Sequence, residues 1–248
     1  METGCRRAIL FLLFSPLFGT GFAQTETPVK VDKPLKSYSH WYFGAEYGVP
    51  FLFGDFTSFS ADKTYVGSQF GGFAGYQVNS WIGIEASART GYTRMGAKSY
   101  AGDYLMNADG MTYYTNQDFN TWKYKDVFSK VHFTNIGLQM NLNVNNFFGP
   151  NRGNRRWTVL LGPAVYAQHF STELINKADK SPLSGKKTDK WNIGIGGDVS
   201  LRYKISRAFD VQLRTGIIWV NNNKMDGIST LIKSKDHFMT SAGLSLIW

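Results

Sequence analysis

Residues 135–145, with the sequence NIGLQMNLNVN, alternate between apolar and polar or small side chains and carry no charge. Successive side chains of an extended strand point to opposite sides, so the apolar residues share one face and the polar residues share the other. A helix would mix the two sets. The segment is therefore predicted to be a β-strand with two unlike faces, and the fold depends on whether the apolar face contacts a protein core or lipid.

The same alternation recurs along the chain. We expect eight strands, at residues 41–51, 66–78, 82–92, 135–148, 157–169, 191–205, 209–219 and 238–248. The predicted connections alternate between brief turns (NS, GPNRGNR and SRA) and longer loops, which is typical of transmembrane barrels with short periplasmic turns and long outer loops. Pro163, inside the fifth strand, cannot donate to the ladder and predicts a bulge there.

Aromatic residues stand at the predicted periplasmic strand ends, where amphipathic rings prefer the bilayer interface. This girdle comprises Trp41, Tyr76, Trp81, Phe148, Trp157, Tyr203, Phe209 and Trp248, and an outer girdle is formed by Tyr92, Trp191, Trp219 and Phe238. A soluble secreted barrel or sandwich is the alternative, but its solvent face would normally carry Lys and Glu. Here the polar face is mostly Gly, Asn, Gln and Ser. We therefore predict an all-β fold, an eight-stranded antiparallel up-and-down transmembrane β-barrel.

The first 23 residues are typical of a secretory signal peptide. Arg6 and Arg7 precede an apolar run over residues 8–18, and Gly21 and Ala23 are small residues before a cut ahead of residue 24. The apolar run is too short for an uncleaved helical anchor. Residues 24–39 are predicted to be a flexible periplasmic leader and residues 40–248 the barrel domain, so the single cysteine, Cys5, is lost with the signal. The mature chain then has neither disulfides nor cysteine metal ligands.

Charge indicates the partner surface. The chain has 27 basic and 18 acidic residues, and removal of the signal leaves 25 and 17, a net charge of +8. An exported protein rarely meets nucleic acid, so an anionic membrane surface is the favoured partner. Outside the signal no run of 18 apolar residues exists, which excludes helical membrane spans but not a barrel. We expect the outer membrane of a Gram-negative bacterium, reached by Sec-type export.

The pattern resembles the small eight-stranded outer-membrane barrels of the OmpA-like and OmpX-like class. The final strand, MTSAGLSLIW, ends the chain in Trp248 and looks like the C-terminal signal that barrel assembly machinery recognises in that class. The resemblance covers about residues 40–248 and implies architecture more than function. The chain also looks like the PorT-like barrels that are associated with a secretion system, although no motif separates the two.

The inward faces of the predicted strands carry three acids and three bases. An eight-stranded barrel is just wide enough for side chains to fill, and isolated charges there would be unfavourable unless they pair. We expect a structural ion network and a filled lumen, with a small-solute or ion channel as the alternative. The predicted network comprises Glu46, Glu85, Arg89, Asp198, Arg202 and Arg214.

One segment suggests catalysis. His169, Ser171 and Glu173 share the lipid-facing parity of the fifth strand, where a His and a Ser could attack an ester of lipid A. The pair is similar to the His-x-Ser-Asn motif of lipid A deacylases, with Thr172 in place of the Asn. The alternative is a purely structural interpretation, in which the strand ends here in a polar loop. We expect no enzyme activity, no metal and no cofactor, because the four histidines lack ligand spacing and are read as interfacial polar residues.

Two loops are the stronger interaction candidates. Residues 97–130 are rich in aromatic side chains that suit a protein or glycan partner or pack on one another, among them Tyr104, Tyr113, Tyr114, Trp122 and Tyr124. Residues 176–190 are basic, and their lysines are candidates for contact with lipopolysaccharide phosphates: Lys177, Lys180, Lys186, Lys187 and Lys190. The sequence therefore favours a non-enzymatic cell-surface barrel that acts through its outer loops or as an accessory subunit of an outer-membrane complex.

Overall fold

The computed structural model describes residues 39–54, 56–98, 104–105, 122–148, 155–183, 188–206, 208–221, 225–227 and 237–248. All of them belong to one compact unit, Ser37–Trp248. The predicted signal peptide and all but the last residue of the predicted leader lie outside the described residues, so both stay predictions.

Nine strands and two short 3₁₀ helices make up the described chain. The strands are β1 (His40–Phe53), β2 (Phe56–Thr57), β3 (Ser68–Gln77), β4 (Ile82–Ala97), β5 (Val127–Asn143), β6 (Trp157–Asn176), β7 (Thr188–Lys204), β8 (Asp210–Val220) and β9 (His237–Ile247). The helices are η1 (Tyr124–Asp126) and η2 (Val144–Phe148). None of the helices in this part of the chain is both long and apolar enough to span a bilayer.

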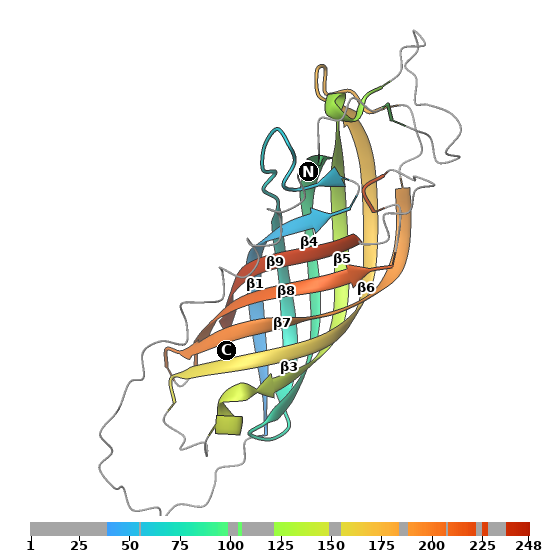
Figure 1. Cartoon of the computed structure of the whole chain (residues 1–248). Coiled ribbons are helices and arrows are strands. Elements are labelled where there is room, and N and C mark those ends of the chain that lie inside the picture. Colours follow the sequence, from blue (N-terminus) through green and yellow to red (C-terminus); the bar gives the residue numbers. More distant parts are fainter. Residues whose placement is uncertain are drawn as a thin grey trace, which may run out of the picture. The chain divides into compact units, whose positions relative to one another are not determined.

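Eight of the strands close into a ring. Each long strand pairs antiparallel with the next along the chain, and β1 pairs with β9. Following Cα partners from Tyr42 once around the ring leads back to β1 at Leu52, a stagger of ten residues. Such a stagger over eight strands corresponds to a tilt of about 40° and an interior just wide enough for side chains. The predicted eight-stranded up-and-down barrel is confirmed, and Figure 1 shows the strands wrapped obliquely around a common axis.

The faces of the barrel are inverted relative to a soluble protein. On β5, Ile136, Leu138 and Met140 are 41–55% exposed, whereas Asn135 and Gln139 are 1–2% exposed. The polar face therefore lines the interior, where amide side chains find hydrogen-bond partners, and the apolar face covers the outside. An apolar exterior around a polar interior is the arrangement that a lipid environment favours.

Exposed rings mark both edges of the apolar exterior. We call the end with the connections 78–81, 144–156 and 205–209 the turn end, and the opposite end the loop end. At the turn end Trp41 packs on Tyr76 and Trp157 on Tyr203, with ring centroids 5.1 and 4.5 Å apart. The side chain of Phe148 lies outside the described residues. The two predicted girdles are about ten residues apart along a strand, a rise of roughly 25 Å, which matches the apolar band of outer-membrane barrels.

Beyond the loop-end girdle the polarity of the two faces reverses. On β5, Val131 and Phe133 point inward and are buried, while Lys130 and His132 point outward. On β4, Met95 is likewise fully buried. The outside of the barrel thus becomes polar where the apolar band ends, and the inside becomes apolar, as expected for strands that continue out of lipid into water.

Three sequence expectations need correction. β5 begins at Val127, eight residues before its predicted start, and residues 144–148 form η2 instead of strand. β6 and β7 are also longer than predicted, so the loop-end connection 177–187 is shorter than the turn-end connection 144–156. The predicted alternation of brief turns and longer loops therefore fails at this point. Pro163 interrupts the pairing of β6 with β5, but the register is the same on both sides, so no bulge forms. The ring of Pro163 removes a donor without inserting a residue.

Candidate functional site in the lumen and at the loop end

A cluster of buried charges fills the middle of the lumen. It comprises Glu46 from β1, Glu85 and Arg89 from β4, Asp198 from β7 and Arg214 from β8, which are 0–6% exposed. Nη1 of Arg214 lies 2.8 Å from Oε1 of Glu85 and 3.5 Å from Oε2 of Glu46, and its Nε lies 3.6 Å from Oδ2 of Asp198. Arg89 contacts Glu46 at 3.2 Å and Asp198 at 3.9 Å. The structure therefore brings together five of the six predicted network residues.

Amide and hydroxyl groups complete this cluster. Asn141 Nδ2 donates to Glu85 Oε2 at 3.0 Å and to the Tyr42 hydroxyl at 2.9 Å. Gln139 Nε2 donates to Asp198 Oδ1 at 3.0 Å. These two buried carboxylates thus accept hydrogen bonds from neutral donors as well as contacting guanidinium groups, which offsets part of the desolvation penalty.

Arg202, the sixth predicted member, lies apart from the cluster toward the turn end. Its Nε donates to Gln212 Oε1 at 3.0 Å, and its guanidinium lies 4.8 Å from the centroid of the Tyr42 ring. Arg202 is half-buried, so it retains some solvent. Sequence parity placed it correctly on the inner face but could not give its height in the barrel.

Two large rings occupy space that is created by glycines on the neighbouring strand. Tyr42 is the Cα partner of Gly75, and Tyr166 is the partner of Gly137. A Cβ added at Gly75 would lie 2.1 Å from Cζ of Tyr42, and one at Gly137 would lie 2.5 Å from Cε1 of Tyr166. These glycines let the rings lie flat against the wall, which packs the narrow interior.

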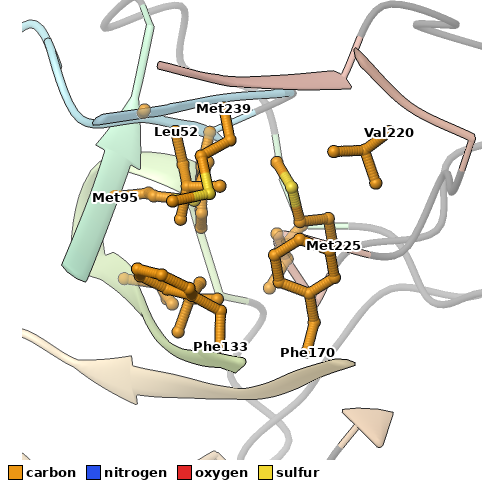
Figure 2. Close-up of a cluster of buried hydrophobic side chains, with 12 residues drawn as sticks. Leu52, Met95, Phe133, Phe170, Val220, Met225 and Met239 are labelled. Atoms are coloured by element: carbon orange, nitrogen blue, oxygen red, sulfur yellow. The ribbon is translucent and has the colours of Figure 1, made fainter. Parts of the chain in front are cut away.

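An apolar cluster fills the lumen at the loop end. We call it the mouth cluster; it comprises Leu52, Phe56, Met95, Ala97, Leu105, Val127, Val131, Phe133, Phe170, Val220, Met225 and Met239. All twelve are 0–6% exposed, and Figure 2 shows the labelled side chains from opposite walls pointing toward one another. Phe56, Leu105 and Met225 come from segments that connect the long strands, so these connections fold inward and close the mouth.

A buried acid and histidine join one connection to the wall. Asp226 and His237 are 0 and 1% exposed, and Nε2 of His237 lies 3.5 Å from Oδ2 of Asp226. The same oxygen accepts a hydrogen bond from the backbone N–H of Phe56 at 3.1 Å. Thr172 Oγ1 donates to the carbonyl of Met225 at 2.7 Å. His237 is therefore a buried partner of Asp226, and its interpretation as an interfacial residue is wrong.

The predicted aromatic loop divides into two groups. Trp122 and Tyr124 pack against the mouth cluster, and the Tyr124 ring meets Phe56 edge-on at 5.6 Å. Tyr104 is 45% exposed and lies beside Lys123, whose Nζ is 5.3 Å from the ring centroid. Tyr113 and Tyr114 lie outside the described residues. Of the three residues that the structure describes, Tyr104 is the exposed one.

The basic loop is tied to another connection by an ion pair. Lys177 Nζ lies 2.9 Å from Oδ2 of Asp62, while Lys180 and Lys190 are exposed. Lys186 and Lys187 lie outside the described residues. Partial burial raises the pKa of Asp62, but hydrogen bonds from Lys177 and Ser60 outweigh this effect and lower its pKa overall. Lys177 is therefore engaged within the protein.

The three possible catalytic residues make separate contacts in the structure. His169 on β6 contacts Asp189 on β7, and its ring packs on Trp191 at 5.0 Å. The hydroxyl of Ser171 is buried and has no hydrogen-bond partner among the described residues. Glu173 is the Cα partner of Lys130 on the neighbouring strand. His169 is thus held by an acid that sequence reasoning missed, because Asp189 comes next to this segment only through the β6–β7 register.

Metal sites and the C-terminus complete the description. No group of three or more His, Cys, Asp or Glu side chains that could hold a metal ion occurs in the described part of the chain. Trp248 is 53% exposed and exchanges two backbone hydrogen bonds of 2.9 Å with Phe43, which ties the last residue to the first long strand. Its role as an assembly signal stays a prediction.

Comparison with known proteins finds similarity in structure alone. No protein-family model and no curated protein sequence matches the chain. A major outer membrane protein of Thermus thermophilus is 10% identical at a TM-score of 0.48, with 84% of this chain and 100% of that chain covered. Neisserial surface protein A is 11% identical at a TM-score of 0.44, with 84% and 95% covered. The attachment invasion locus protein Ail of Yersinia pestis, in complex with the heparin analogue sucrose octasulfate, is 10% identical at 0.44, with 85% and 99% covered. At these scores the matches carry no argument of their own, and the closed eight-stranded architecture rests on the strand pairing of the chain itself.

Proposed function

We propose that this protein is a non-enzymatic barrel of a Gram-negative outer membrane, with a lumen that is closed to solutes, and that it acts through its loop end at the cell surface. The observation that carries the proposal is the double closure of the interior. The charged cluster around Arg214 fills the middle of the barrel, and the mouth cluster fills its loop end. A passage would have to break both.

The lengths of the strands support an orientation in which the loop end faces the outside of the cell. β4, β5, β6 and β7 have 16, 17, 20 and 17 residues, against 10 or 11 in β3, β8 and β9. The extra length lies at the loop end, where the outer surface becomes polar. Figure 1 shows these strands extending beyond the shorter ones at that end. A raised, water-facing wall with a packed interior is suited to present a rigid surface to a partner, including a larger membrane complex beside which the barrel acts as a subunit.

Conductance tests the closed lumen. Purified protein in planar bilayers is expected to give no stable large conductance. A control variant with Phe133 and Phe170 both replaced by Ala opens the mouth cluster but leaves the charged cluster intact, so it is also expected to stay closed. A stable, large conductance of the wild-type protein would contradict the proposal.

The site of action is tested separately, in intact cells. A photoreactive amino acid at Tyr104 is expected to give a discrete crosslinked species, while the same group at Phe209, at the turn end, is expected to give none. Crosslinks that formed from Phe209 alone would place the action at the periplasmic side.

A further inference from the structure

Two cations stand side by side on the outer surface of β4 and β5. Arg94 and Lys130 are Cα partners across the two strands, on the outward face. Like charges directly opposite each other on a sheet destabilise it. No ion pair of either residue occurs among the described residues, which include β6 at this height and the segment 56–67 before β3. Among the described residues, two positive charges therefore lie side by side without an ion pair to either of them.

Arg94 begins a row of cations and stacked aromatic rings on this surface. The guanidinium of Arg94 lies 5.8 Å from the centroid of the Phe128 ring, and Phe128 stacks on Tyr65 at 6.2 Å with an interplanar angle of 22°. Nζ of Lys63 lies 4.9 Å from the centroid of the Tyr65 ring. Arg94 and Lys63 thus contact the two stacked rings, and cation–π contact restricts these two side chains, which are otherwise flexible.

The row borders the apolar exterior. Arg94 is two residues beyond Tyr92 on the same outward face, and Tyr92, at 44% exposure, belongs to the predicted outer girdle. The headgroups of a lipid whose acyl chains contact the band lie at this height. Two carboxylates are near: Glu173, the Cα partner of Lys130 from β6, and Asp62, which is paired with Lys177. One acid for three cations leaves the row positive.

We propose that Arg94 and Lys130 bind the phosphate group of an outer-leaflet lipid headgroup. The occupant is a lipid because the row continues the surface that contacts acyl chains, and this assignment rests on the membrane position given under the proposed function. A phosphate between the two side chains accepts paired hydrogen bonds from the Arg94 guanidinium and a charge contact from Lys130. It thereby relieves the repulsion that the fold otherwise retains.

Binding of bisphosphorylated lipid A and of the same lipid without its phosphates, to the full barrel in neutral detergent, tests the site by native mass spectrometry. Wild type is expected to prefer the phosphorylated lipid. The variant R94Q/K130Q is expected to bind it about 30-fold more weakly, since each cation near a membrane surface contributes roughly a fivefold change. The control K125Q/K204Q loses the same charge at exposed positions elsewhere and is expected to stay within about twofold of wild type.

Three outcomes overturn the site. Undiminished lipid binding by R94Q/K130Q would show that these two residues do not bind the phosphate. An equal loss of binding in the control K125Q/K204Q would show that the lipid is held by general charge attraction. Displacement of the lipid by millimolar inorganic phosphate makes it a site for free phosphate. The different gel mobility of heated and unheated samples checks that the variants are folded. Conductance measured in parallel tests the closed lumen, so failure of the lipid site can be told apart from failure of the proposed function.

Discussion

Removal of the Arg214 side chain is the sharpest test of the charged cluster. Arg214 is 3% exposed and lies within 3.6 Å of carboxylate oxygens from β1, β4 and β7. In the variant Arg214→Leu, Arg89 remains as the one guanidinium of the charged cluster, beside the three carboxylates of Glu46, Glu85 and Asp198. Breaking a buried ion pair by removing one partner lowers stability by about 3–5 kcal/mol. We expect a loss in that range, since three carboxylates lose a contact at once.

Urea unfolding of the barrel in phospholipid vesicles, followed by tryptophan fluorescence and by gel mobility of unheated samples, measures this loss. The matched control is Arg202→Leu, which removes an arginine from the same lumen. Arg202 is half-buried, donates a hydrogen bond to Gln212 and lies against the Tyr42 ring, but it forms no ion pair among the described residues, so its loss is expected to be about 1–2 kcal/mol.

A second substitution separates charge from packing. Glu85 has the shortest contact with Arg214, at 2.8 Å. If uncompensated charge is the cause of the loss, Glu85→Gln in the Arg214→Leu background should restore part of the stability, although the same change in the wild-type protein should lower it. The reasoning is refuted if Arg214→Leu is no less stable than Arg202→Leu, or if the second substitution only adds to the loss.

Three further substitutions test the mouth and the wall. Asp226→Asn removes the charge that faces His237 at 3.5 Å, and thermal unfolding should show a loss of about 1–3 kcal/mol, with an unchanged midpoint arguing against the buried pair. Gly137→Val drives a side chain into the Tyr166 ring and should destabilise by about 1–3 kcal/mol in urea, whereas Gly72→Ala, whose Cβ would lie 3.5 Å from its nearest neighbour, should be neutral. Because the pKa of Asp62 is lowered in the folded protein, its stabilising effect is present above its ordinary value of 3.8 and is lost as the pH falls through the folded pKa. The difference in unfolding free energy between wild type and Asp62→Asn should therefore be present at pH 6 and shrink as the pH is lowered below 3.8; a constant difference would contradict the ion pair.

The membrane part of the fold was predictable because lipid imposes one rule on every strand. Alternation about residues such as Leu138 and Gln139 assigns each side chain to a face, and parity alone gave the inward position of all six lumen charges. What parity cannot give is the register between strands. The contact of His169 with Asp189, and the pairing of Arg94 with Lys130, depend on which residues stand opposite each other.

The length of the strands at the loop end was underestimated for a different reason. Where the strands leave the apolar band, the inside becomes apolar and the outside polar, so a search for apolar exteriors stops at the girdle. The predicted strand therefore begins only at residue 135, although Val131 and Phe133 continue the strand pattern with opposite parity. The position of the reversal is itself a signal, since a phase change of the alternation within one continuous strand marks the membrane surface.

This reversal explains why two unlike cores occupy one barrel. Inside the apolar band the wall already satisfies the lipid, so the interior is free to be polar and is held by ion pairs, whose geometry is specific and whose disruption leaves buried charge. Above the band the wall faces water, and the strands need an apolar interior to stay together, which Phe170, Met225 and their neighbours provide. The charged cluster should therefore respond to removal of single charges and the mouth cluster to loss of side-chain volume, and conditions that weaken the hydrophobic effect should loosen the mouth before the membrane-embedded ring.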